Sequence, residues 1–458
     1  MFINHEEIEN LLEMARVATP GEKELVVLKV ENSEKLEYKD IAILLETTEE
    51  SLMNRIYEVA GDIKKKIYGN RIVMFAPLYI SNYCVNNCVY CGFQHCNAMP
   101  RRKLNREEIQ EEVRILEKMG HKRLALEAGE DPVNCDLDYV LEAIDAIYET
   151  KLDNGSIRRV NVNIAATTVD NYRRLNEKGI GTYILFQETY HKPTYEAMHP
   201  KCMKGDYSYH LTAFDRAMQS GIGDVGAGAL FGLYDAKFEV LGLMMHNDHL
   251  EKEYGVGFHT ISMPRLKPAE GMDLANFPHL VDDDTFKRLV AIIRIAVPFT
   301  GIIMSTRESA EMRKALLKYG VSQVSAGSCT GIGGYKDSET NVNTEQFQLS
   351  DERRPLEVIN DLIDDGYIPS YCTACYRKGR TGDRFMQLAK SGNIKYVCTP
   401  NALMTLLEYT LDYGDAELLA KSNALIESEI AKIDRGDIKD LLVKNIELLR
   451  QGNRDLFL

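Results

Sequence analysis

The sequence contains no long apolar run and no basic leader at its beginning. No stretch of its 458 residues approaches the ~20 consecutive apolar residues that a membrane helix needs. The first six residues, Met-Phe-Ile-Asn-His-Glu, lack the positively charged region with which a secretory signal starts. A content of 45% hydrophobic and 27% charged residues is typical of a globular protein. We therefore expect a soluble, cytoplasmic protein.

The chain also lacks an excess of positive charge. Its formal net charge is −14, whereas a nucleic-acid partner requires a basic face to meet the phosphates. The short basic runs at 64–66 and 101–103 are typical of solvated surfaces. We expect neither a nucleic-acid partner nor a membrane partner.

Cysteine, by contrast, is plentiful. The chain has ten cysteines, and in a cytoplasmic protein they indicate metal ligands or buried thiols, because disulfides are rare there. Six of them form two groups of three. We expect the other four to be small buried side chains, namely Cys96, Cys135, Cys202 and Cys329.

The first group has the spacing CxxxCxxC. Cys84, Cys88 and Cys91 follow the apolar run 72–80, so one loop can wrap three thiolates around a soft metal centre. Three ligands leave one iron of a four-iron cluster open, and an open iron can bind S-adenosylmethionine and pass it an electron. The alternative is a structural zinc loop, which needs a fourth ligand such as Cys96. With Gly-Phe directly after the third cysteine, the motif resembles the radical-SAM superfamily.

From residue 71 onward, β-rich runs alternate with amphipathic helical stretches. The strand candidates are 71–79, 123–127, 159–164, 182–186, 224–231, 257–263, 301–305 and 322–325. Stretches such as 106–119 and 282–297 are long enough for crossover helices. Eight tandem βα units predict the α/β class and a complete (β/α)8 TIM barrel. A half-open barrel of six strands is the alternative.

Two regions flank the expected barrel, which we place at 69–345. Residues 1–68 predict an N-terminal helical extension, with helices at 6–15, 39–45 and 49–67. Residues 346–458 predict a C-terminal α-helical domain, with helices at 355–365, 383–390, 402–413, 416–433 and 438–450. The stretch 331–344 is rich in Gly, Asn and Ser and is the expected linker.

In a TIM barrel the loops that follow the strands carry the active site. The first cysteine group follows the first strand candidate, and polar residues follow or end four others. We expect all of them to meet at one mouth: 128–130, Asn163, 187–188 and 307–308.

The second group is Cys372, Cys375 and Cys398. A redox CxxC pair would not need Cys398, and zinc would need a fourth ligand from elsewhere. We favour an iron–sulfur cluster with an open iron, because the first motif already indicates a reducing context. The basic run 377–380 either offsets the negative charge of such a cluster or is a solvated loop.

One histidine stands out. His259 lies early in the sixth strand candidate, where an inward side chain would point into the lower half of the barrel, away from the first cysteine group. A lone histidine is more often a core residue that donates to a backbone carbonyl than a metal ligand. The residues by themselves therefore favour a structural role.

Three stretches together resemble one family. The first cysteine motif, Phe-Gln-Glu-Thr-Tyr-His at 186–191 and Cys-Thr-Ala-Cys-Tyr-Arg-Lys-Gly-Arg-Thr-Gly-Asp at 372–383 are similar to the HydG family of FeFe-hydrogenase maturases, which are radical-SAM tyrosine lyases. The similarity runs from about residue 67 to about residue 413. It implies that a 5′-deoxyadenosyl radical takes hydrogen from the amino group of L-tyrosine. The Cα–Cβ bond then breaks, which gives p-cresol and dehydroglycine.

The same resemblance assigns roles to residues at the mouth. The first cysteine group would hold the 4Fe–4S cluster that cleaves S-adenosylmethionine. That cofactor would be bound by Phe93, Glu130, Asn163, Glu188, Gly226 and Gly228, with the last two in a turn. Tyrosine would be held by Tyr90, Arg307 and Ser325. Arg307 suits the carboxylate of the substrate because a guanidinium binds a carboxylate in a fork.

For the second cysteine group, the resemblance implies an auxiliary 4Fe–4S cluster with an additional iron. A free cysteine molecule would bridge that iron, and His259 would be its protein ligand. Dehydroglycine would become CO and cyanide there, giving an Fe(CO)2(CN)-cysteine synthon for the hydrogenase H-cluster. The implied partners are L-tyrosine, an external electron donor and other hydrogenase maturation proteins, including the scaffold GTPase.

Two positions depart from the family pattern, and two other functions compete. Phe258 stands where the family has proline, and Cys329 lies close to Ser325 in the sequence. One competing function is the thiazole-pathway tyrosine lyase, which stops at dehydroglycine and lacks the second cysteine motif. The other is a non-catalytic iron–sulfur scaffold, in which Glu130 and Arg307 would have no purpose.

Overall fold

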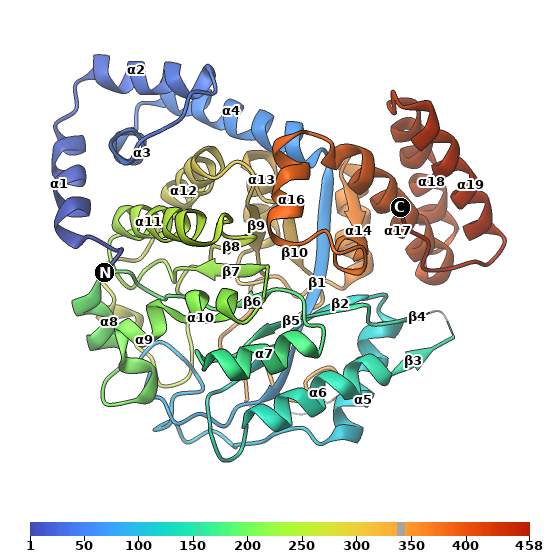
Figure 1. Ribbon diagram of the computed structural model, residues 1–458, viewed down its shortest axis with the longest axis horizontal. Coiled ribbons are helices and arrows are strands. Elements are labelled where there is room, and N and C mark those ends of the chain that lie inside the picture. The colour runs from blue at the N-terminus through green and yellow to red at the C-terminus, as the bar shows by residue number, and fades with distance from the viewer. Residues whose placement is uncertain (154, 337–343) are drawn as a thin grey trace.

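The centre of the computed structural model is a closed barrel of parallel strands (Figure 1). The structure describes residues 1–153, 155–336 and 344–458. The barrel strands are β1 (Arg71–Ser81), β2 (Arg123–Ala128), β5 (Arg159–Asn163), β6 (Tyr183–Ile184), β7 (Val225–Gly228), β8 (Thr260–Ser262), β9 (Gly301–Met304) and β10 (Gln323–Ser325). Because β1 pairs in parallel with both β2 and β10, the ring is complete. The predicted (β/α)8 barrel is confirmed, and the half-open alternative is wrong.

Both faces of the barrel strands are covered, as the apolar runs in the sequence predict. Three consecutive residues of β2, whose side chains alternate between the two faces, are all buried: Leu124, Ala125 and Leu126. The outer face is covered by crossover helices: α5 (Arg106–Lys118), α6 (Leu137–Glu149), α7 (Val169–Glu177), α10 (Ala213–Gln219), α11 (Ala236–Tyr254), α12 (Asp283–Ala296) and α13 (Ala310–Tyr319). Short helices lie in the loops: α8 (Lys192–Met198), η1 (Met203–Gly205), α9 (Tyr207–Leu211) and η2 (Leu274–Asn276).

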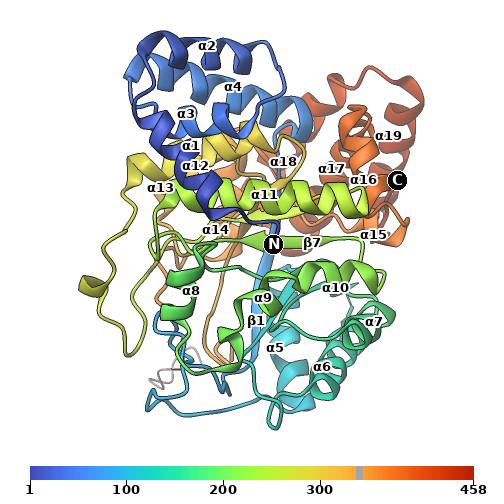
Figure 2. The same ribbon diagram turned by 60° about the vertical axis from the view of Figure 1, so that its left-hand side comes forward.

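Four helices precede the barrel and pack on α11, α12 and α13 (Figure 2). They are α1 (His5–Arg16), α2 (Pro20–Glu31), α3 (Tyr38–Glu46) and α4 (Glu50–Tyr68). The three predicted N-terminal helices are present. The sequence prediction omitted α2, because its apolar residues do not gather on one face. A capping box between Thr19 and Glu22 and a proline in the first turn were the usable signals.

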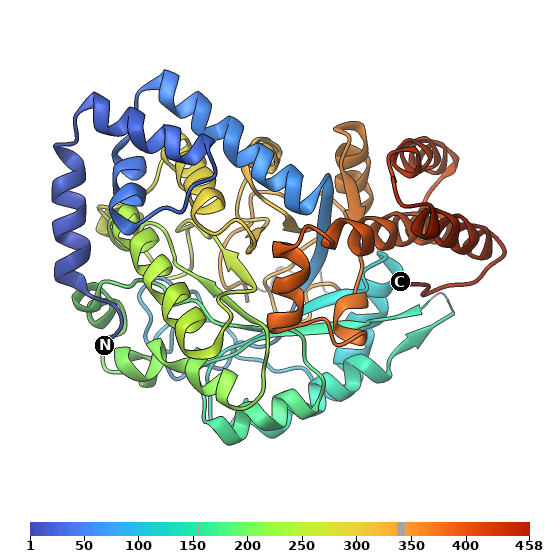
Figure 3. The same cartoon turned by 45° about the horizontal axis from the view of Figure 1, so that its top comes forward.

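The region after the barrel is helical, with one exception. Its helices are α14 (Pro355–Asp364), α15 (Ala374–Arg377), α16 (Gly382–Lys390), α17 (Ile394–Tyr413), α18 (Ala416–Ala431) and α19 (Gly436–Arg450) (Figure 3). The exception is β11 (Ile368–Ser370), which pairs in parallel with the first residues of β1. This strand was not predicted. It places the residues that follow it beside the N-terminal ends of the barrel strands.

Some segments need only brief mention. A small hairpin of β3 (Lys151–Leu152) and β4 (Gly155–Ser156) extends from the barrel. None of the helices in the described ranges has the length and apolar character needed to cross a bilayer. The expected linker falls partly on 337–343, outside the described residues. The division of the chain at residues 68 and 345 stays a prediction.

Candidate functional site

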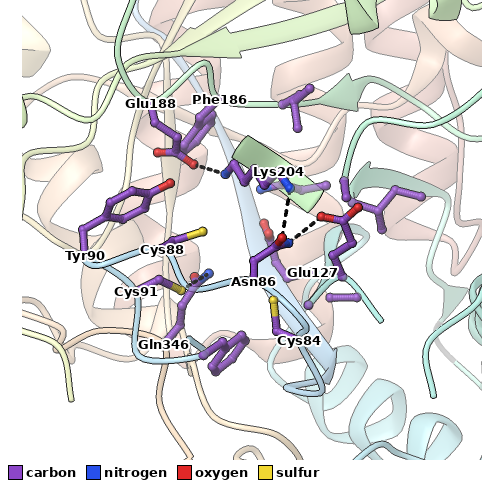
Figure 4. Close-up of a pocket in the computed structure, with 18 of the residues that line it drawn as sticks. Cys84, Asn86, Cys88, Tyr90, Cys91, Glu127, Phe186, Glu188, Lys204 and Gln346 are labelled. Carbon is purple, nitrogen blue, oxygen red and sulfur yellow. Dashed lines mark hydrogen bonds and ion pairs between the residues drawn. The ribbon is translucent and has the colours of Figure 1, made fainter. Parts of the chain in front are cut away.

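The loops at the C-terminal ends of the strands surround an open cavity of about 140 Å³ (Figure 4). Cys84, Cys88 and Cys91 line it from the loop after β1. Tyr90 and Phe93 of the same loop also line it, as do four residues from four further loops or strand ends: Glu130, Asn163, Glu188 and Arg307. The tertiary structure thus gathers at one mouth residues that are up to 223 positions apart (307 − 84).

The cysteine loop is held by its own backbone and by one arginine. The N–H of Val85 donates to the carbonyl of Glu130 at 2.8 Å. The guanidinium of Arg101 donates to the carbonyls of Asn82, Phe93 and Gln94, at 2.7, 2.8 and 2.5 Å. These bonds fix the path of the loop without using any thiol. The three sulfur atoms therefore remain available as ligands.

The electrostatics of the loop oppose free thiolates. Burial raises the pKa of Cys84 and raises that of Cys91 to about 11. A hydrogen bond with Cys202, together with burial, raises the pKa of Cys88. Thiolates form in such a place only if a positive group compensates them, as bound metal does.

A polar network that the sequence did not reveal lies beside the cysteines. The Lys204 ammonium is 2.6 Å from a carboxylate oxygen of Glu188. The backbone N–H of Lys204 donates to Asn86 Oδ1 at 2.9 Å. Asn86 in turn donates to Glu130 at 2.5 Å. Glu188 has φ of 66°, an uncommon conformation for a non-glycine residue that is often found at functional sites. The ammonium of Lys204 lowers the pKa of the neighbouring thiols, although burial outweighs it.

A second cavity of about 100 Å³ continues into the barrel, and Arg307 belongs to the walls of both cavities. Ser325 lines only this inner cavity, whereas Tyr90 lines only the outer one. The Tyr90 hydroxyl is 2.6 Å from Nε2 of His199. The three residues assigned to tyrosine therefore do not surround one space, and Arg307 is the member that connects the two.

Arg307 and Glu127 give this inner wall its charge. The Arg307 guanidinium lies over the ring of Phe347, with the central carbon 3.3 Å from the ring centroid. Within the described ranges no carboxylate forms an ion pair with it, and burial lowers its pKa. Burial raises the pKa of Glu127 to about 8. The wall thus presents a cation that can accept an anionic ligand group.

The two glycines assigned to S-adenosylmethionine do not lie in a turn. Gly226 and Gly228 belong to strand β7, and neither lines the two upper cavities. A Cβ atom at Gly226 would lie 2.6 Å from Thr260 Oγ1, and one at Gly228 would lie 2.7 Å from the Phe186 ring. Close packing inside the barrel therefore explains both glycines, and the predicted turn is wrong.

The second cysteine group lies at the opposite end of the barrel, where the strands begin. A cavity of about 80 Å³ is lined there by Cys372, Cys375, Cys398 and His259, together with Arg71 at the start of β1. Cys372 reaches this place because it follows β11, and Cys398 because α17 begins at Ile394 and not at 402 as predicted. The structure thus brings His259 together with the thiols.

Hydrogen bonds orient the imidazole of His259. Its Nε2 lies 3.0 Å from the hydroxyl of Tyr376, and its Nδ1 lies 3.5 Å from Asp224. The preceding residue, Phe258, donates its N–H to Asn247 Oδ1 at 2.9 Å. Proline lacks this donor, so the departure from the family pattern adds a hydrogen bond just before His259.

Of the four scattered cysteines, Cys202 contacts the first group through its hydrogen bond with Cys88. Cys96 is exposed, and Cys135, Cys202 and Cys329 are half-buried, so the expectation that all four are buried is wrong. Cys96 does not line the cavity of the first group. Cys329 does not line the inner cavity either, although Ser328 and Thr330 do. The zinc alternative therefore lacks the fourth ligand that the sequence suggested, Cys96, and the thiol next to the first group is that of Cys202.

Comparisons with known proteins agree with this geometry. A family model described as the radical SAM superfamily matches residues 78–241, and one described as the Biotin and Thiamin Synthesis associated domain matches residues 262–368. A crystal structure of HydG, a maturase of the [FeFe]-hydrogenase, is 53% identical, with a TM-score of 0.97 over 100% of both chains. The chain belongs to the HydG family.

Two further relatives extend the comparison. HydG from Carboxydothermus hydrogenoformans is 38% identical, with a TM-score of 0.85 over 96% of this chain and 98% of that one. The 2-iminoacetate synthase of Salmonella typhimurium is 30% identical over 77% of this chain and 92% of the relative. As a radical-SAM enzyme of the HydG family, the chain uses S-adenosylmethionine and a 4Fe–4S cluster.

The donor sets suit polynuclear clusters. In the parts of the chain that the structure describes, no group of three His, Cys, Asp or Glu side chains converges closely enough to hold a single metal ion. Yet each cysteine group lines one cavity. Thiols spread around a cavity match a four-iron cluster, whose ligands bind different iron atoms. The residues present therefore fit the cofactor that the HydG family uses.

Arginines of the barrel supply charge at the lower end. Arg71 and Arg123 line the lower cavity, and Arg123 donates to the carbonyl of Cys372 at 3.1 Å. A hydrogen bond from Cys375 and the nearby Arg71 lower the pKa of Cys398. We expected the basic run 377–380 to offset the negative charge of a cluster. Part of that positive charge thus comes from Arg71 and Arg123, which the sequence did not single out.

Proposed function

We propose that this HydG-family chain is a radical-SAM tyrosine lyase that also makes the diatomic ligands of the hydrogenase H-cluster. It would split L-tyrosine at the Cα–Cβ bond into p-cresol and dehydroglycine. It would then convert dehydroglycine to CO and cyanide and release an Fe(CO)2(CN)-cysteine synthon. The observation that carries the proposal is one barrel with a three-thiol group at each end, the second of them next to His259.

At the upper end, Cys84, Cys88 and Cys91 would hold the first 4Fe–4S cluster. The cluster and S-adenosylmethionine, when bound, supply the electron and the 5′-deoxyadenosyl radical that start the reaction. Glu130 and Glu188 present carboxylates to the amino and hydroxyl groups of S-adenosylmethionine. The network of Asn86 and Lys204 holds both carboxylates in place. Phe93 and Asn163 complete the wall.

Arg307 would bind the carboxylate of tyrosine. Its position on the wall between the two upper cavities allows the phenol ring to extend into the inner cavity while the amino group stays near the first cysteine group. Ser325 and Glu127 line the inner cavity and offer polar contacts. The phenol ring would thereby lie inside the barrel, between these residues.

At the lower end, Cys372, Cys375 and Cys398 would hold the auxiliary cluster, and His259 would bind the additional iron together with a free cysteine molecule. The hydrogen bond from the Tyr376 hydroxyl would have to rearrange, because it now points at His259 Nε2. The name of the Salmonella relative supports the first half of the reaction, since 2-iminoacetate is dehydroglycine. The external electron donor and the scaffold GTPase remain proposed partners.

One incubation separates this function from the two alternatives. Reconstituted protein is mixed with dithionite, S-adenosylmethionine and tyrosine, and p-cresol and CO are measured in the same sample. We expect both products. Formation of p-cresol without CO would indicate the thiazole-pathway lyase, and the absence of both products would indicate a scaffold.

A further inference from the structure

Residues 455–458, which we name the strap, lie across the turn that carries the second cysteine group. Figure 2 shows the C-terminus next to α15 and α17. The Asp455 carboxylate accepts two hydrogen bonds from Arg377 Nη1, at 2.8 and 2.6 Å. The ring of Phe457 lies 3.9 Å from the guanidinium carbon of Arg377. Arg380 donates to the carbonyl oxygen of Leu458 at 2.5 Å. The strap therefore contacts both ends of the basic run 377–380.

The strap also contacts α17. The N–H of Asp455 donates to Glu408 at 2.8 Å, and the N–H of Leu458 donates to Asn401 Oδ1 at 2.8 Å. Asn401 lies three residues after Cys398, so it is almost one helical turn away on the same helix. The strap thus connects the element that carries Cys375 to the element that carries Cys398.

Elsewhere the turn is held by the hydrogen bond between Tyr376 and His259 and by the Gly382 N–H, which donates to Asp224 Oδ1 at 2.8 Å, whereas Arg377 is exposed. Helix α15 contains only four residues, Ala374–Arg377, of which only Ala374 is fully buried, and so short a helix is not stable alone. In the described part of the chain, every hydrogen bond of the Arg377 side chain goes to Asp455. The positive charges of the run 377–380 repel one another, and the strap supplies the opposite charge.

We propose that the strap is a positioning element for the auxiliary cluster: it sets the distance between Cys372 and Cys375 on one side and Cys398 on the other. None of its residues lines the lower cavity, so it acts through Arg377, Arg380 and Asn401. This inference rests on the proposed function, because it takes the second cysteine group as the ligand set of a cluster.

Three variants test the strap. A chain that ends at Arg454 lacks it but keeps the contact of Arg454 with Asp412, which anchors the end of α19. Asp455→Asn removes the charge that pairs with Arg377 and, at 3.1 Å, with Arg158, which keeps its partner Glu408. Asparagine tolerates the φ of 60° found at this position. Arg450→Gln is the matched control, because Arg450 pairs with Glu447 of its own helix.

The first measurement uses trypsin on cluster-free protein, because the run 377–380 contains three cleavage sites. We expect cleavage there to be about ten-fold faster without the strap. For Asp455→Asn we expect about two- to five-fold, since the ion pair is partly exposed. The control should match the parent. If the shortened chain were cleaved at the parent rate, the strap would not hold the turn.

The second measurement counts iron and records the electron paramagnetic resonance spectra of both clusters after reconstitution. We expect the shortened chain to lose at least about half of the auxiliary signal, with the first cluster and p-cresol formation unchanged. Faster cleavage with an unchanged auxiliary cluster would refute the positioning role. A parent protein without any auxiliary signal would refute the proposed function, whereas the trypsin result would still test the strap. If the shortened chain also lost its first cluster, the Asp455→Asn variant would take its place. Its trypsin cleavage rate and its auxiliary cluster signal would then decide whether the strap positions the cluster.

Discussion

Replacing Arg307 by alanine should separate tyrosine binding from the cleavage of S-adenosylmethionine. The guanidinium lies on the wall that the two upper cavities share, and in the described ranges it forms no ion pair with a protein carboxylate. In the part of the chain that the structure describes, the guanidinium packs on the ring of Phe347. The substitution therefore leaves no buried protein charge unpaired, and the fold should tolerate it.

The magnitude follows from the kind of contact that is lost. A charge-assisted bidentate pair with the substrate carboxylate is worth about 2–4 kcal/mol in a partly buried site. Removal should weaken tyrosine binding by about 30- to 700-fold. Arg307→Lys keeps the charge but loses the planar fork, so we expect a smaller loss of about ten-fold.

The assay is the dependence of 5′-deoxyadenosine and p-cresol formation on tyrosine concentration. For Arg307→Ala we expect the tyrosine concentration at half-maximal p-cresol formation to rise as calculated, while tyrosine-independent cleavage of S-adenosylmethionine persists. The control is Arg173→Ala, which removes an exposed arginine that pairs with Asp170 on α7. An unchanged tyrosine dependence in Arg307→Ala would refute the assignment of the substrate carboxylate.

Three other perturbations test other parts of the molecule. Cys88→Ala should abolish the first cluster's signal and 5′-deoxyadenosine formation, and cleavage at the parent rate would contradict the radical-SAM role. His259→Ala and Cys375→Ala should still form p-cresol but lose CO, with dehydroglycine hydrolysed to glyoxylate; CO in parent proportion to p-cresol in either variant would contradict the two-site scheme. Glu239, which accepts hydrogen bonds from the Thr189 hydroxyl and the Tyr190 N–H, has its pKa raised by burial from 4.5 to about 8. The folded state therefore keeps the proton on Glu239 to a higher pH than the unfolded state does. The contribution of Glu239 to the free energy of unfolding is consequently full below about pH 4.5 and is lost as the pH rises through about 8. The melting temperature of Glu239→Gln relative to the parent should accordingly rise over that range, and a constant difference would contradict the shifted pKa.

The chemistry of the first cysteine group could be predicted because it depends on short sequence distances. A CxxxCxxC loop can surround a cluster whatever the rest of the chain does, so Cys84, Cys88 and Cys91 were found directly. The eight βα units were found for a similar reason, because alternating apolar runs and amphipathic helices are local patterns. The pairing of β10 with β1, which closes the barrel, was inferred only from the number of predicted strands. The structure confirms this pairing.

What the sequence did not determine depends on contacts between distant residues. Strand β11 has three residues, too few for any periodicity, and exists because the start of β1 offers it an edge. Lys204 and Glu239 have no local signature. The first becomes important only when η1 brings it to Glu188, and the second only when α11 packs below Tyr190. The role of His259 likewise could not be read from the residues alone, because a lone histidine belongs to no local sequence motif. Its place beside the second cysteine group results from barrel closure, β11 and α17 acting together, which no short stretch of sequence encodes.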